Sequence, residues 1–231
     1  MAERPIFIPA NEPPFFREVI VKFEWCPGLS LLQKRRSIQS LHAAARSQGF
    51  GSLLEVSSRS IEATGVALSA FNLSLRHPAA EGETSVECVF QASKVFERGG
   101  PYLDLLRVSS RQAKQDPRLQ QSGELQRFSF MGESWPLEPK TAFYDWLYMR
   151  ALTSRSDLIS GLGNYSAFTD IEFNPQKSFS CQARSVAMFV SLKRSGMLEG
   201  ALSSKRAFLR TIERKPLTSP VPAGNRQGTL F

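Results

Sequence analysis

The sequence has little of the two residue types that most often ligate zinc. Its 231 residues include two histidines, His42 and His77, and three cysteines, Cys26, Cys88 and Cys181. The cysteines lie far apart and form no CxxC pair, which is typical of reduced thiols in a cytosolic protein. We therefore expect a cytoplasmic protein with no metal centre and no cofactor.

Long apolar segments are also missing. The N-terminus, MAERPIFIPANEPPFF, lacks the apolar core of a signal peptide, and no run reaches the roughly 18 apolar residues that a membrane span needs. This pattern predicts a protein that is neither exported by a standard signal nor inserted in a membrane. Hydrophobic residues nevertheless make up 42% of the chain, which is typical of a globular protein with a sizeable core.

The chain length suits one domain with an appendage. We expect a single domain over residues 1–212, with a short β-rich N-terminal part in residues 1–75 and a helical body in residues 86–200. The predicted fold class is α+β and predominantly helical. Residues 213–231 are rich in proline, glycine and polar side chains, so we expect a flexible C-terminal tail there.

The periodicity of apolar residues predicts helices and strands along the chain. Helices are expected at Leu31–Gln48, Val86–Phe96, Thr141–Leu152 and Ser180–Ser195. Strands are expected at Arg17–Trp25, Leu53–Val56 and Gly65–Leu75, the last being a strand or a bent extended segment. Residues 165–177 are expected to form a loop.

Basic residues are in excess, with 29 Lys and Arg against 21 Asp and Glu. A net charge of +8 favours an anionic partner such as nucleic acid, a nucleotide or an acidic surface, but charge alone does not choose among them. Lys34, Arg35 and Arg36 crowd the start of a predicted helix, where positive charge is unfavourable unless an anion docks there. They are therefore candidate nucleic-acid contacts, and the alternative is a solvated basic face.

The stretch VECVFQASKVF, from Val86 to Phe96, carries the strongest chemical signal. On a helix, Glu87, Gln91 and Lys94 fall at positions i, i+4 and i+7 and form one column. A carboxylate there can stabilise positive charge on a glycosidic carbon, and a desolvated lysine can act as a nucleophile. The alternative is an amphipathic surface helix with a Glu–Lys pair.

Four features in order resemble the NADAR family of small N-glycosidases that act on ADP-ribose-like or ribosylamine substrates. They are an E-x-x-x-Q-A-x-K helix at residues 87–94, the segment RVSSRQAKQDPRL at residues 107–119, Trp135, and an MRAL helix end at residues 149–152. The resemblance implies a NADAR fold with a small β-containing N-terminal part.

The phrases LSAFNL, FQASKVFERGGPYLDLL, FYDWLY and FTDIEFNPQKSFSCQARS are similar to the NADAR branch that accompanies DNA ADP-ribosyltransferase toxins as antitoxin. This similarity covers residues 15–198 and implies an enzyme that removes ADP-ribose from guanine bases in DNA, with the cognate toxin as functional partner. Two alternatives remain: an N-glycosidase of a small ribosylated metabolite, and a non-catalytic antitoxin that binds the toxin.

The resemblance and the chemistry of the bond together suggest roles for individual residues. Glu87 stabilises the charged sugar carbon or activates water, and Lys94 is the amine nucleophile. Phe173 stands where other family members have a tryptophan, so it takes the stacking role in that wall. The remaining substrate-binding candidates are Gln91 for hydroxyls or the base edge, Asp170 to orient Lys94 or a ribose hydroxyl, Phe71, Asn72 and Trp135 beside the base, and Arg59 and Arg118 for phosphates.

The last five residues, Gln227 to Phe231, end in a pattern that resembles the peptide with which bacterial replication proteins bind the sliding clamp. In such a motif Leu230 and Phe231 fill an apolar pocket and Gln227 is hydrogen-bonded. The sliding clamp is therefore an expected partner, and the alternative is a tail without this function.

Overall fold

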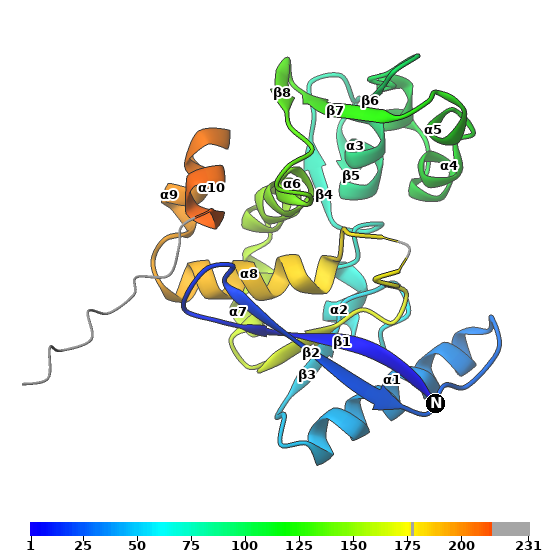
Figure 1. Ribbon diagram of the computed structural model, residues 1–231, viewed down its shortest axis with the longest axis vertical. Coiled ribbons are helices and arrows are strands. Elements are labelled where there is room, and N and C mark those ends of the chain that lie inside the picture. The colour runs from blue at the N-terminus through cyan, green and yellow to red at the C-terminus, as the bar shows by residue number, and fades with distance from the viewer. Residues whose placement is uncertain (177, 214–231) are drawn as a thin grey trace, which may run out of the picture.

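A computed structural model describes residues 1–176 and 178–213 (Figure 1). Its N-terminal part is built on a four-stranded sheet with the strand order β2-β1-β9-β3. Strand β1 (Ala2–Pro9) pairs antiparallel with β2 (Phe16–Phe23) and with β9 (Ala167–Thr169), and β9 runs parallel to β3 (Leu53–Glu55). The segment predicted as a loop at residues 165–177 therefore supplies the strand that lies between β1 and β3.

One helix packs on each face of this sheet. Side chains alternate along a strand, so Ile6 and Phe7 of β1 point to opposite faces. Ile6 packs in a cluster with Ile38 and Leu41 of helix α1 (Leu31–Ser47), whereas Phe7 belongs to the larger core that includes helix α8 (Gln182–Arg194). As predicted, both helices form, because each has a continuous apolar side.

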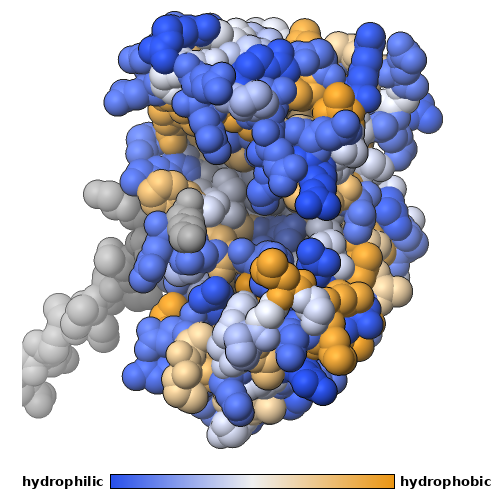
Figure 2. Space-filling model, turned by 90° about the vertical axis from the view of Figure 1, so that its right-hand side faces the viewer, coloured by the Kyte–Doolittle hydropathy of each residue, from blue (hydrophilic) through white to orange (hydrophobic). Residues whose placement is uncertain are grey.

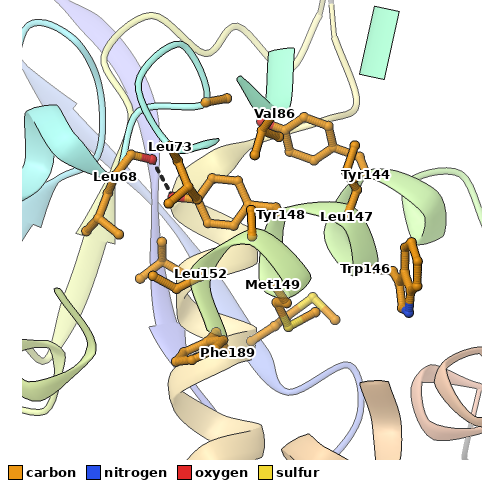
Figure 3. Close-up of a cluster of buried hydrophobic side chains, with 14 of the residues drawn as sticks. Leu68, Leu73, Val86, Tyr144, Trp146, Leu147, Tyr148, Met149, Leu152 and Phe189 are labelled. Atoms are coloured by element: carbon orange, nitrogen blue, oxygen red, sulfur yellow. Dashed lines mark hydrogen bonds between the residues drawn. The ribbon is translucent and has the colours of Figure 1, made fainter. Parts of the chain in front are cut away.

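Helix α6 (Ala142–Thr153) lies at the centre of the larger core and is buried on nearly all sides. Figure 3 shows its Tyr144 and Tyr148 directed toward Val86 and Leu68. The buried hydroxyl of Tyr148 donates a hydrogen bond to the backbone carbonyl of Leu68. This bond ties α6 to the segment just before residues 69–71, which line the cavity described below.

The part of the chain predicted as a helical body also contains strands. A three-stranded sheet is formed there by β6 (Lys94–Phe96), β7 (Leu125–Phe130) and β8 (Glu133–Trp135), and a hairpin of β4 (Ser74–Arg76) and β5 (Glu83–Ser85) comes just before it. The other helices are α2 (Ala63–Ala67), α3 (Val86–Ala92), η1 (Leu103–Arg107), α4 (Ser110–Gln115), α5 (Arg118–Gln121), α7 (Ser156–Leu162), α9 (Leu198–Leu202) and α10 (Lys205–Ile212). The fold is therefore α+β as predicted, with more strand than the prediction allowed.

Two predicted elements are wrong. The extended segment expected at Gly65–Leu75 is instead helix α2 followed by turns, and only its end joins β4. The central helix ends at Ala92, and the next residues form β6.

No helix in the described ranges is both long and apolar enough to cross a bilayer. The single domain over residues 1–212 stays a prediction, and the tail from residue 214, with Gln227, Leu230 and Phe231, lies outside the described residues.

Candidate active site

A cavity of about 730 Å³ opens between the three-stranded sheet with α3 on one side and the loops that follow β3 and β9 on the other. The space-filling view shows the surface hollowed on the side of the molecule that carries α4 (Figure 2). The cavity is large enough for a nucleotide-sized ligand, and its lining combines aromatic rings with a few polar side chains.

Glu87 stands in the first turn of α3 and lines this cavity. Ser85 caps the helix by accepting a hydrogen bond from the Cys88 amide, which starts α3 at the residue before Glu87. The backbone N–H of Glu87 donates to the carbonyl of Ala70, 2.9 Å away, so the helix start is joined to the cavity wall. Glu87 is only 6% exposed, and this burial strengthens the electrostatic effect of its carboxylate inside the cavity.

Gln91 fixes the orientation of that carboxylate. Its Nε2 donates a hydrogen bond of 2.8 Å to Oε1 of Glu87, one helical turn away. Oε1 of Gln91 is then buried without a hydrogen-bond partner in the described part of the chain. Because a buried acceptor without a partner is costly, this oxygen is placed to accept a hydrogen bond from a bound ligand.

Lys94 reaches the cavity from a strand, not from the helix. It is the first residue of β6 and pairs with Phe128 of β7, so the predicted single helical column is instead a helix–strand junction. Burial lowers the pKa of its amine, although the negative charge of Glu87 partly opposes this effect. A lysine with a lowered pKa has more neutral amine near pH 7 and is a better nucleophile.

A glycine lies directly behind the lysine. Gly100 has φ +89°, a conformation that glycine adopts readily, and a β-carbon built on it would collide with the carbonyl oxygen of Lys94. The backbone of the lysine can therefore occupy its position only because residue 100 has no side chain.

Stacked aromatic rings form one wall of the cavity. The ring of Phe128 lies 5.3 Å from that of Phe90 and 4.8 Å from that of Phe143, and Tyr144 meets Phe90 edge-on at 5.0 Å. The Lys94 ammonium is 5.0 Å from the centre of the Phe90 ring. Such flat apolar faces are suited to stacking on a base or packing against a sugar ring.

Asp170 contributes a carboxyl group from the opposite wall. Its Oδ1 accepts hydrogen bonds from the backbone N–H groups of Glu172 and Phe173, at 3.0 and 3.2 Å. Burial raises its pKa to about 8, and the nearby carboxylate of Glu55 contributes to this rise. Burial therefore favours the protonated form of Asp170, which can donate a hydrogen bond.

The structure brings most of the predicted substrate contacts to the cavity. The predicted residues that line it are Arg59, Phe71, Glu87, Gln91, Lys94, Asp170 and Phe173. Their roles stay predictions, but residues far apart in the sequence are now placed around one space.

Three predicted contacts lie elsewhere. Trp135 has no exposed surface and packs against Phe143 and Trp146, so it supports the wall from behind and cannot stack on a substrate in this structure. Arg118 is paired with Asp104 and Asp116, outside the cavity lining. Asn72 is exposed, and its amide donates to the backbone carbonyl of Val66.

The basic start of α1 is mostly engaged within the protein. Nζ of Lys34 lies 3.1 Å from a carboxylate oxygen of Glu172, and Arg35 reaches the backbone carbonyl of Ser60 at 3.4 Å. Arg36 alone of the predicted trio is exposed. The prediction that these residues contact nucleic acid stays a prediction, with two of the three side chains already partnered.

Several residues of the cavity were not predicted from sequence. They are Phe90, Lys114, Phe128, Tyr144 and Gln182. Tyr144 lies in a helix rich in aromatic residues, a pattern typical of core, and it belongs to the core while also lining the cavity. Phe128 carried no signal because its strand was not predicted. Gln182 accepts a hydrogen bond of 2.7 Å from the Ala70 amide, which joins α8 to the same wall.

An α+β fold with a carboxylate, an amide and an amine facing one aromatic cavity suits the N-glycosidase-like class of protein to which NADAR proteins belong. Residues 2–220 match the family described as DarT1-associated NADAR antitoxin, and the chain belongs to that family. The resemblance seen in the sequence is thereby confirmed, together with an antitoxin role associated with the DarT1 toxin. A search of the curated proteins returned no match.

Proposed function

We propose that this chain is an ADP-ribosyl glycosidase that removes ADP-ribose from guanine bases of DNA and so reverses the modification made by its toxin. One observation carries the proposal. A buried carboxylate, Glu87, and an amine of lowered pKa, Lys94, line one cavity from two successive elements of the chain. That pair supplies the electrostatic and nucleophilic groups that cleavage of an N-glycosidic bond requires.

In the proposed reaction, the bond between ribose C1′ and the guanine nitrogen breaks. Its electron pair leaves with the nitrogen, which takes up a proton. The neutral amine of Lys94 donates its lone pair to C1′, forms a covalent C1′–N link and gives up a proton, which balances the one taken up by the guanine nitrogen. Water then attacks C1′, the C1′–N bond to Lys94 breaks with its electron pair going to the lysine nitrogen, and that nitrogen takes up the proton that water loses. Glu87 stabilises the positive charge that develops on the sugar in both steps.

The rest of the cavity suits the proposed substrate. The rings of Phe90 and Tyr144 offer surfaces for the base or the sugar, and the free Oε1 of Gln91 can accept a hydrogen bond from an N–H or O–H group. Asp170, as a neutral acid, can donate a hydrogen bond to a ribose hydroxyl. A base inside this cavity has left the duplex stack or belongs to single-stranded DNA.

Replacement of Glu87 by Gln tests the proposal directly. The glutamine oxygen can still accept the hydrogen bond from Gln91, so the fold should persist while the negative charge is lost. We expect release of ADP-ribose from an ADP-ribosylated single-stranded oligonucleotide to fall by about 10²-fold or more. The matched control is Glu18→Gln, on an exposed position of β2 outside the cavity. Full turnover by Glu87→Gln would exclude the assignment.

A further inference from the structure

A second, smaller cavity of about 260 Å³ lies beside the first. Its lining consists of Arg59, Phe71, Arg111, Lys114 and Gln115. Arg59, Phe71 and Lys114 also line the larger cavity, so the two spaces adjoin through these three side chains. Helix α4, which carries Arg111 and Lys114, is on the side of the molecule turned to the viewer in Figure 2.

The smaller cavity concentrates positive charge without neutralising it. Its lining contains three cationic side chains and no carboxylate. Arg111 and Lys114 lie at positions i and i+3 of α4, on one face, and neither forms an ion pair within residues 1–176 and 178–213. Arg59 has only a long contact of 4.0 Å with Glu172. These charges are therefore available to an anionic ligand.

An aromatic ring stands among the cations. Nζ of Lys114 lies 5.2 Å from the centre of the Phe71 ring, and Phe71 borders both cavities. Cations spaced along a groove and an aromatic face beside them are the two elements with which proteins bind single-stranded nucleic acid: the cations contact phosphates, and the ring stacks on a base. A ligand with phosphates alone would not need the ring.

We propose that the smaller cavity binds the DNA strand next to the modified guanine, with backbone phosphates on Arg111 and Lys114 and a neighbouring base on Phe71. This inference rests on the proposed function, because it takes the larger cavity as the place of the modified guanine. It assigns strand binding to α4 and the turn after α2, whereas two of the three basic residues at the start of α1 are engaged within the protein.

Binding of an unmodified single-stranded oligonucleotide, followed by fluorescence anisotropy, tests the site without any turnover. The double variant Arg111→Gln/Lys114→Gln should bind about 10-fold more weakly or worse, and the dependence of log K on log salt should fall by about 1.4 for two lost phosphate contacts. The matched control is Arg17→Gln/Lys193→Gln, which removes the same charge from exposed positions outside both cavities. Unchanged binding by the site variant, or equal loss in both variants, would overturn the inference.

A second comparison separates strand phosphates from the diphosphate of ADP-ribose itself. We expect Arg111→Gln, at a residue that lines only the smaller cavity, to raise KM for an ADP-ribosylated oligonucleotide and to leave KM for ADP-ribosylated guanosine unchanged. An equal rise for both substrates would place the diphosphate on α4 and overturn the strand assignment. If the unaltered protein released ADP-ribose from neither substrate, the proposed function would fail, and the anisotropy comparison would still decide whether the cavity binds a strand.

Discussion

Lys94 is the residue whose protonation state decides whether the proposed reaction proceeds. Burial lowers the pKa of its amine, Glu87 raises it, and the positive charge of Lys114 lowers it further. Only the neutral amine can attack C1′. The turnover number kcat should therefore rise with pH up to the pKa of Lys94, and the midpoint should lie below the ordinary lysine value of 10.5.

Replacement of Lys114 by Gln should move that midpoint to higher pH, because the variant loses a charge that lowers the pKa of Lys94. The measurement is the pH profile of kcat at saturating ADP-ribosylated oligonucleotide, so that weaker binding does not enter. Lys193→Gln, at an exposed residue that does not line the cavity, should keep the original midpoint. A midpoint that is the same in all three proteins would show that Lys94 does not titrate in the rate-limiting step.

Among the secondary-structure elements, α6 holds the cavity wall through its contact with the segment before Phe71. The Tyr148 hydroxyl donates to the buried carbonyl of Leu68. Tyr148→Phe leaves that carbonyl without a partner, so the free energy of unfolding should fall by about 1–3 kcal/mol, as measured by urea denaturation. Tyr165→Phe is the control, since its hydroxyl bonds to Glu62 at the surface, and it should cost clearly less. Equal losses would mean that the buried hydrogen bond stabilises the fold no more than the exposed one does.

How far the elements were predictable depended on where their partners lie in the chain. Helices α1 and α8 were predicted because their apolar sides and the cap at Ser30 are local features. The pattern at Val86–Phe96 is apolar both at helical and at alternating spacing, so the sequence could not reveal that α3 ends at Ala92. That end is set by the pairing of β6 with β7, whose partner residue Phe128 is more than thirty positions away.

The site shows the same division between local and distant information. Glu87, Gln91 and Lys94 were found because they are close in sequence and reactive in type. Trp135 was assigned to the cavity but is buried behind its wall, whereas Tyr144 belongs to the core and also lines the cavity. An aromatic residue is suited to either place, and only the tertiary packing of α6 decides which ring faces the cavity.

For the whole molecule, buried carboxyl groups link stability to pH. Asp170 has a folded-state pKa of about 8, against the ordinary value of 3.8, so between these values the folded protein binds more protons than the unfolded chain. Its contribution to stability therefore falls as pH rises, by up to about 1.4 kcal/mol per pH unit. His42 has its pKa lowered to about 4 and acts in the opposite direction, but only below its ordinary value of 6.5.

From pH 6.5 to 8 His42 contributes little, so the pH dependence of stability there reports the neighbouring buried carboxyl groups of Asp170 and Glu55, both of which have raised pKa values. Asp170→Asn removes the ionisable group, so this variant should gain stability relative to the unaltered protein as pH rises through that window. Thermal or urea unfolding at several pH values measures the difference. A difference that stays constant with pH would mean that Asp170 is ionised in the folded protein.

The antitoxin role offers a test of the whole molecule in cells. A protein that reverses the modification needs its carboxylate, whereas a protein that merely binds the toxin does not. Cells that express the toxin should survive with the unaltered protein or with Glu18→Gln, and should die with Glu87→Gln at the same protein level. Survival with Glu87→Gln would indicate neutralisation of the toxin by binding.

Gly100 has a consequence for how relatives of this protein are recognised. A search pattern made only of reactive residues, E-x-x-x-Q-A-x-K, asks whether the chemistry is present. Five residues separate Lys94 from Gly100, and this glycine leaves room for the lysine backbone. A pattern lengthened by x-x-x-x-x-G also asks whether the amine can be placed. Chains that keep the reactive residues but carry a side chain at the last position should lack the activity although they match the shorter motif.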